Sequence, residues 1–178
     1  MTKQKLSVKP LITRSAIDKR VQEMGEEISQ AYQGVDELIV ICALKGAVMF
    51  MSDLVRHITL PLSIDFIQVS SYGDSTESSG VVRLDKGVGC DIKNKDVLLV
   101  EDIIDTGASL AYMTKYLNGL EPRSLKTCLF LDNPHRRTVP MEPDFLGFII
   151  PNEFVIGYGL DYKQQYRNLP YVGIKIAL

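Results

Sequence analysis

The sequence contains few cysteines, and their positions exclude a zinc site of the usual kind. Cys42, Cys90 and Cys128 are odd in number and far apart, and they fit no zinc-ligand spacing. Cys42 and Cys128 lie in apolar, strand-like runs, where we expect buried and reduced thiols. Reduced thiols are typical of a cytoplasmic protein.

Long apolar runs and a strong charge of either sign are also absent. The first segment, MTKQKLSVKP, lacks the apolar core of a signal peptide. No run approaches the roughly 20 apolar residues that cross a bilayer. The net charge is only −2, so there is no general electrostatic attraction to nucleic acid or to an anionic membrane. We therefore expect a cytoplasmic protein without a nucleic-acid or membrane partner.

What is present is the composition of an ordinary globular domain. The 178 residues are 46% apolar and 24% charged. This length is enough for one domain with a sizeable core. We expect a single domain over residues 1–178.

The spacing of the apolar residues alternates between helical and strand patterns. Helical spacing begins at Ile17, with Ser15 as a candidate cap and Gly34 as a stop. Further helices are expected at 47–58 and 108–120, and strands at 38–43, 62–70, 81–84, 97–100 and 124–131. This order predicts an α/β fold with a mainly parallel, twisted sheet flanked by helices. Because ligands bind beyond the carboxyl ends of strands in such sheets, the candidate segments are 44–46, 101–109 and 131–134.

The run VLLVEDIIDTGASL, residues 97–110, concentrates three carboxylates at the end of an expected buried strand. Glu101, Asp102 and Asp105 repel one another, so they would be costly there without a cation or polar partners. Glu101 and Asp102 could accept hydrogen bonds from ribose hydroxyls, or hold a hard cation directly or through water. The simpler alternative is a pair of solvated charges at a strand end.

The last part of this run, DTGAS, suits a phosphate group. Gly107 allows close backbone approach, Thr106 and Ser109 add hydroxyl donors, and the start of a helix presents free amides. The spacing is not that of a Walker A loop. Asp105 or Thr106 could instead be only a helix cap. Together with the two carboxylates before it, however, the segment indicates a sugar-phosphate site.

The same run resembles the phosphoribosyl-pyrophosphate signature of the type I phosphoribosyltransferases. Three further segments resemble the bacterial hypoxanthine-guanine branch of that family: Lys45-Gly46 after a strand, Ser71-Tyr72 opening a long polar loop, and FVIGYGLDYKQQYRNLPYVG near the C-terminus. The resemblance extends from about Glu37 to the C-terminus. It implies a transferase of purine salvage with the fold of this family, including a small hood formed by terminal segments. The implied partners are phosphoribosyl pyrophosphate, a 6-oxopurine base, Mg²⁺, and further copies of the chain in a homodimer or homotetramer.

The resemblance also assigns the residues of the acidic run to different parts of the substrates. Asp105 would exchange a proton with N7 of the purine, and this is the catalytic assignment. Glu101 and Asp102 would face the ribose hydroxyls and magnesium. The 5′-phosphate would be bound by Thr106, Gly107, Ala108 and Ser109.

Residues outside the run would complete the implied site. Lys45 and Gly46 would bind the diphosphate, with a cis peptide between Leu44 and Lys45. The loop from Ser71-Tyr72 would close over the reaction centre and exclude water. The other implied contacts are Arg167 with the diphosphate, Asp161 with magnesium, Phe154 and Val155 with the purine, and Ile103 with the sugar or base. Without the resemblance, most of these residues would be assigned to the core or to the solvated surface.

One position departs from the family pattern. Asn133 stands where the family commonly has a lysine that donates to purine O6. The amide of Asn133 can still donate, but it is shorter and uncharged. His135 and Arg136 lie close by in the sequence, and the sequence leaves open whether either compensates. The preference among 6-oxopurines therefore stays open.

Two other functions remain as alternatives. A regulator on the same fold would bind phosphoribosyl pyrophosphate as a signal and nucleic acid as its output. Such a protein should have a basic surface or an added DNA-binding domain, and neither is evident in this acidic chain. The other alternative is transfer to a different base, such as xanthine or a pyrimidine.

Overall fold

The central feature of the fold is a sheet of six strands. The structure is a computed structural model, which describes residues 7–71 and 82–176. The strand order is β4-β3-β2-β5-β6-β7. The five strands from β3 to β7 pair in parallel, while β4 is antiparallel to β3, so the expected mainly parallel sheet is confirmed. The strand bounds are Leu38–Leu44 (β2), Leu62–Ser71 (β3), Val82–Lys86 (β4), Asp96–Ile104 (β5), Ser124–Asp132 (β6) and Phe145–Ile149 (β7).

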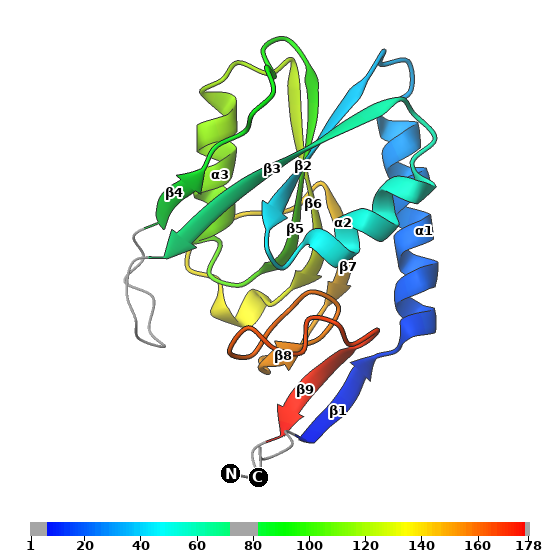
Figure 1. The fold of residues 1–178 in the computed structure, drawn as a ribbon, viewed down its shortest axis with the longest axis vertical. Coiled ribbons are helices and arrows are strands. Elements are labelled where there is room, and N and C mark those ends of the chain that lie inside the picture. Colours follow the sequence, from blue (N-terminus) through cyan, green and yellow to red (C-terminus); the bar gives the residue numbers. More distant parts are fainter. Residues whose placement is uncertain (1–6, 72–81, 177–178) are drawn as a thin grey trace.

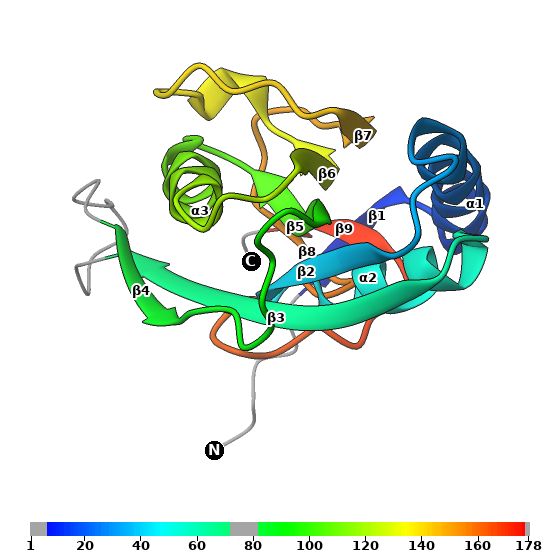
Figure 2. The same cartoon turned by 90° about the horizontal axis from the view of Figure 1, so that it is seen from above.

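Helices cover both faces of this sheet, as Figures 1 and 2 show. Helices α1 (Arg14–Ala31) and α2 (Val48–Leu54) lie on one face and α3 (Ala108–Asn118) lies on the other. Each face has its own apolar cluster, because the central strands are buried on both sides. Short 3-10 turns follow α2 at Val55–His57 and β6 at Pro134–Arg136.

A second, smaller sheet is built from the two ends of the chain. Strands β1 (Ser7–Ile12), β9 (Val172–Ile176) and β8 (Val155–Ile156) form it in that order, with antiparallel pairing. It lies beyond the carboxyl ends of the main strands, at the bottom of Figure 1. This sheet is the hood of terminal segments that the resemblance implies.

Several local predictions differ from the structure. The first helix begins before Ser15, because the side chain of Thr13 accepts a hydrogen bond from the amide of Ala16 at 3.3 Å and is the N-cap. Strand β5 continues to Ile104, so Glu101 and Asp102 lie within the strand rather than at its end. The expected helix over 47–58 ends at Leu54 and continues only as the 3-10 turn.

The structure also bears on the predictions about cysteines and about membrane-spanning runs. Cys42 and Cys128 are buried free thiols, as expected, while Cys90 is exposed. Burial raises the pKa of the Cys42 thiol to about 12. In the described part of the chain, every helix is too short or too polar to cross a membrane.

Candidate functional site

The loop between β5 and α3 forms the floor of a cavity. Gly107 has a φ of +87° and precedes the first residue of α3 without any side-chain cap. A Cβ at this position would lie 2.7 Å from the carbonyl oxygen of Val139, so the tight loop requires glycine. Thr106 Oγ1 accepts a hydrogen bond from the amide of Ala108 at 3.3 Å. The helix start is therefore held by the loop itself, and the side chain of Asp105 has no capping role.

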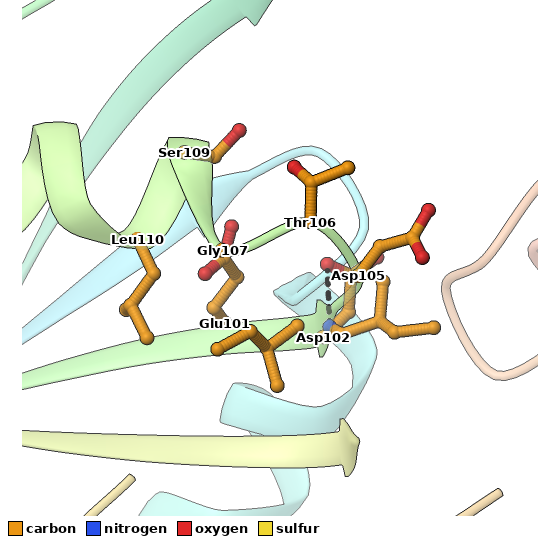
Figure 3. A pocket seen from close by; sticks show the side chains of 9 residues that line it. Glu101, Asp102, Asp105, Thr106, Gly107, Ser109 and Leu110 are labelled. Carbon is orange, nitrogen blue, oxygen red and sulfur yellow. Dashed lines mark hydrogen bonds between the residues drawn. The ribbon is translucent and has the colours of Figure 1, made fainter. Parts of the chain in front are cut away.

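Figure 3 shows how the strand and the loop enclose this cavity. The hydroxyls of Thr106 and Ser109 point to the same side of the loop. The lining residues run from the end of β5 to the first turn of α3: Glu101, Asp102, Ile103, Ile104, Asp105, Thr106, Gly107, Ser109 and Leu110. Ala108 belongs to the same turn but is not part of the lining. Hydroxyls, backbone amides and a helix start arranged in this way suit a phosphate group.

Two adjacent carboxylates face this cavity, of which Glu101 is buried and Asp102 is half-buried. Glu101 is only 8% exposed, and its Oε2 has no hydrogen-bond partner among the described residues. Burial, and then the charge of Asp102, hold the pKa of Glu101 well above its usual range. Burial also raises the pKa of Asp102 to about 6, although Asp102 Oδ1 accepts a hydrogen bond from the amide of Ile103. Glu101 Oε2 is therefore a buried acceptor that no other group in the described part of the chain satisfies.

Glu101→Gln should stabilise the unliganded protein by about 1 kcal/mol near neutral pH, because it removes a buried carboxylate that lacks a partner. The pKa of Glu101 is higher in the folded than in the unfolded chain, so the folded chain holds the proton more tightly. The free energy of unfolding of the wild type therefore falls as the pH rises from the pKa of Glu101 in the unfolded chain towards its pKa in the folded chain. The glutamine variant does not titrate here, so its stability relative to the wild type increases over the same range. Thermal unfolding at about pH 5 and about pH 8 measures this difference.

The matched control for this prediction is Glu142→Gln, which removes an exposed carboxylate of the same type. This variant should unfold at the wild-type temperature at both pH values. If Glu101→Gln is no more stable than the wild type at the higher pH, the buried carboxylate is not a source of instability.

Asp105 lies between the phosphate loop and a basic turn. Its Oδ2 pairs with the guanidinium of Arg136 at 3.0 Å, while its Oδ1 is buried and has no hydrogen-bond partner within residues 7–71 and 82–176. Partial burial raises the pKa of Asp105, and the charges of Arg136 and Arg137 oppose that rise. One carboxylate oxygen is thus held by a cation and the other is free to accept a proton or a hydrogen bond.

A second cavity adjoins the first and contains the predicted purine contacts. Asn133, Phe154 and Val155 line it, together with Arg136, Glu153, Leu160 and Asp161. Asp102, Ile103 and Asp105 line both cavities, so the two meet at these residues. Phe154 is 50% exposed and its ring packs edge-on against Tyr162 at 6.0 Å, whereas Val155 is buried in β8. Such an aromatic face suits a flat heterocycle.

The predicted diphosphate loop lies against Asp102. The peptide between Leu44 and Lys45 is cis, as the resemblance implies. A Cβ at Gly46 would overlap Oδ2 of Asp102, and a Cβ at Gly159 would overlap the carbonyl oxygen of Gly46. Glycines at both positions therefore let the loop at 45–46, the end of β5 and the segment after β8 approach one another closely. The side chain of Lys45 is exposed.

Asp161 and Arg167 form an ion pair with each other. The guanidinium of Arg167 lies 2.7 Å from Oδ1 of Asp161 and also donates to the carbonyl of Gly159 at 2.7 Å. Asp161 lines the cavity around Phe154, but Arg167 lines a neighbouring cavity beside α2. The sequence predicts these two residues as separate ligands of magnesium and diphosphate, and their mutual pairing is not foreseen.

The predicted lid falls largely outside the described residues. Tyr72 lies there, and Ser71 is described only as the last residue of β3. The expected contacts of both side chains therefore stay predictions.

Comparison with known protein families agrees with this geometry. The family model for the phosphoribosyl transferase domain matches residues 12–163, which include β2 to β8 and both cavities. The chain belongs to the phosphoribosyl transferase family. The prediction from the acidic run and the loop after it is thereby confirmed at the level of the family and its fold.

Individual members of the family are similar to this chain over most of its length. The hypoxanthine-guanine phosphoribosyltransferase of Bacillus subtilis is 45% identical, over 93% of this chain and 92% of that protein. The crystal structure of a hypoxanthine-guanine phosphoribosyltransferase from Bacillus anthracis superimposes with a TM-score of 0.90 at 40% identity, over 97% of this chain and all of that one. The bifunctional protein TilS/HprT of Listeria innocua is also 45% identical, but this chain spans only 26% of it.

The acidic residues of this site fit a magnesium ion that is shared with a ligand. The described residues hold no cluster of three acidic, histidine or cysteine side chains that could bind a metal ion by itself. Mg²⁺ usually combines one or two carboxylates with water and substrate phosphates. The unpaired Oε2 of Glu101 and the neighbouring Asp102 match that requirement, whereas both oxygens of Asp161 are already engaged.

Sequence reasoning assigned no role to Glu153 and Leu160 of the second cavity, and it left open whether Arg136 compensates for Asn133. Arg136 follows β6 in the segment LDNPHRR, and an arginine pair beyond a parallel strand is the signal that could have indicated it. Arg137, by contrast, donates to backbone carbonyls of Asp105 and Met141 and pairs with Asp132, so it holds the turn together.

Proposed function

We propose that this protein transfers the 5-phosphoribosyl group of phosphoribosyl pyrophosphate to N9 of hypoxanthine or guanine, giving IMP or GMP and pyrophosphate. The observation that carries the proposal is the meeting of two cavities at Asp102, Ile103 and Asp105. One cavity has a phosphate loop and the other an aromatic face, so a sugar phosphate and a purine would lie end to end. The similar enzymes of Bacillus support the same reaction.

The reaction replaces one bond at the anomeric carbon by another. N9 of the purine forms a bond to C1′ as the bond from C1′ to the diphosphate oxygen breaks, and its electron pair leaves with the diphosphate. The purine must also lose a proton, which in this proposal passes from N7 to the unpaired Oδ1 of Asp105. The sugar carries positive charge during the exchange, which the carboxylates of Glu101 and Asp102 would stabilise.

The remaining predicted residues would bind and orient the donor. Thr106, Gly107, Ala108 and Ser109 would hold the 5′-phosphate, and Glu101 and Asp102 the ribose hydroxyls. Lys45, Gly46 and Arg167 would face the diphosphate, and Ile103 the sugar or the base. A Mg²⁺ ion, when bound, would neutralise the diphosphate and stabilise it as a leaving group. Glu101 and Asp102 would hold that ion directly or through water. Asp161 would be a ligand of a second Mg²⁺ ion, and it would first have to release Arg167.

Pyrophosphate release with a panel of bases tests the proposed reaction. We expect release with hypoxanthine and guanine, dependent on both the donor and Mg²⁺, and little release with pyrimidines, because the aromatic cavity would position N9 of a purine against C1′. A protein that binds phosphoribosyl pyrophosphate but releases no pyrophosphate with any base would be the regulator. Release with xanthine alone would keep the reaction class and change the substrate.

Two properties of the whole protein remain proposals as well. We expect a cytoplasmic location, since Cys42 and Cys128 are buried as free thiols. A homodimer or homotetramer is expected from the resemblance to the family. Light scattering of the purified protein measures the oligomeric state directly.

A further inference from the structure

The second cavity, which contains Phe154 and is called the aromatic cavity below, is rich in negative charge. Among the described residues that line it, four are carboxylates: Asp102, Asp105, Glu153 and Asp161. Arg136 is the only cationic side chain of that lining. Asn133 is 2% exposed and adds no charge, and its buried Oδ1 has no hydrogen-bond partner in the part of the chain that the structure describes. The cavity therefore offers many acceptors, and its one charged donor is Arg136.

Arg136 is placed where it can move towards a ligand. It is the last residue of the 3-10 turn after β6, and its side chain is 50% exposed. Among residues 7–71 and 82–176, its one ion pair is with Asp105 at 3.0 Å. Arg137 differs in this respect, because its side chain is only 16% exposed and is bonded to Asp105, Met141 and Asp132, so it cannot leave without disrupting the turn. Of the two arginines, only Arg136 can donate to a molecule in the cavity.

The acceptor pattern of a 6-oxopurine requires such a donor. N7 and O6 lie side by side on one edge of the base, and both are acceptors once the N7 proton has left. A carboxylate near O6 would repel it, whereas an arginine is a common partner of the O6 and N7 edge. Asp105 is already placed at N7 in the proposed reaction, so its ion-pair partner would lie on the same edge, beside O6.

We propose that Arg136 donates to the 6-oxo group of the purine and thereby selects 6-oxopurines over purines that lack this oxygen. This inference rests on the proposed function and deepens it. Arg136 would supply the charged donor that Asn133 does not. Its guanidinium would pass from Asp105 to O6 as the base enters, which also leaves Asp105 free to accept the N7 proton.

Arg136→Met tests this role by comparing two bases. The KM for hypoxanthine should rise about 10- to 100-fold, as expected for the loss of a charge-assisted hydrogen bond. Unsubstituted purine has no O6, so it should inhibit the variant and the wild type about equally. We expect the two inhibition constants to differ less than about twofold, as for a substitution that removes no contact with the inhibitor. The KM for phosphoribosyl pyrophosphate should not change. Arg136→Lys, which keeps the charge, should recover part of the affinity for hypoxanthine.

A second variant and a control keep the result specific. Asn133→Lys combined with Arg136→Met returns a cation to the same cavity and should lower the KM for hypoxanthine again. Arg56→Met removes an exposed arginine paired with Asp53 and should behave as the wild type in every measurement. A thermal unfolding curve of each variant shows that it is folded.

The possible outcomes separate the inference from the proposed function. If hypoxanthine and purine lose affinity equally in Arg136→Met, the arginine only holds Asp105 in place and the inference is wrong. It is equally wrong if neither base loses affinity. If the wild type converts neither hypoxanthine nor guanine while it binds phosphoribosyl pyrophosphate, the proposed function itself fails and the inference fails with it.

Discussion

Replacing Asp105 with asparagine is expected to lower the turnover of hypoxanthine by about two to four orders of magnitude, the range typical for loss of a general acid or base. Asparagine has the same shape and can still contact the loop, but it cannot take a proton from N7. The affinity for phosphoribosyl pyrophosphate should stay near the wild-type value, because the phosphate loop and Glu101 are unchanged. Turnover by pyrophosphate release, together with donor binding by calorimetry, measures both effects.

The pH dependence of the wild type gives an independent measure of the same group. Asp105 must be ionised to accept the proton, and burial raises its pKa in the unliganded protein. The value of kcat/KM for hypoxanthine should therefore rise with pH, and the midpoint of this rise should lie above the ordinary pKa of an aspartate. The charge of Arg136 opposes the rise in the pKa of Asp105 and so limits how high this midpoint lies. Asp105→Asn should lose this rise with pH.

The control for Asp105→Asn is Asp36→Asn, which changes an exposed aspartate before β2 and should leave turnover unchanged. Unchanged turnover in Asp105→Asn itself would remove the general-base assignment. A loss of donor affinity as large as the loss of turnover would instead indicate that the substitution disturbs the phosphate loop.

The parts of the fold that could be predicted are those that depend on local pattern. The buried strands β2, β5 and β6 read as continuous apolar runs because both of their faces are covered. The loop after β5 could be predicted because its glycine, its hydroxyls and the helix that follows are adjacent in sequence. The order of these elements was enough to indicate a parallel sheet and the edge at which ligands bind.

The parts that could not be predicted depend on contacts between distant segments. Strand β1 pairs with β9 at the other end of the chain, so the local sequence around Ser7–Ile12 has no pattern that predicts a strand. The pairing of Asp161 with Arg167 and that of Asp105 with Arg136 both arise from the folded loops. The close approach of Gly159 to Gly46 likewise joins two segments that share no local pattern.

That approach makes Gly159→Ala the substitution with the largest expected effect on the structure of the site. Gly159 has a φ of +101°, where an L side chain is strained, and its Cβ would overlap the carbonyl oxygen of Gly46. Strain and overlap together should lower the free energy of unfolding by about 3 kcal/mol. Because the carbonyl belongs to the proposed diphosphate loop, the KM for phosphoribosyl pyrophosphate should rise and turnover should fall as well.

Gly34→Ala separates the two causes. Gly34 has a similar φ of +86°, but a Cβ there would meet nothing within 4 Å. This variant should lose only about 1 kcal/mol, the cost of the backbone conformation, with unchanged kinetics. Chemical denaturation of both variants gives the difference in stability, which is then the cost of pushing the segment after β8 away from Gly46. Equal losses, with unchanged kinetics in both, would show that this contact contributes to neither stability nor donor binding. A larger loss of stability in Gly159→Ala, together with a raised KM for the donor, would instead show that the segment after β8 holds the diphosphate loop in place.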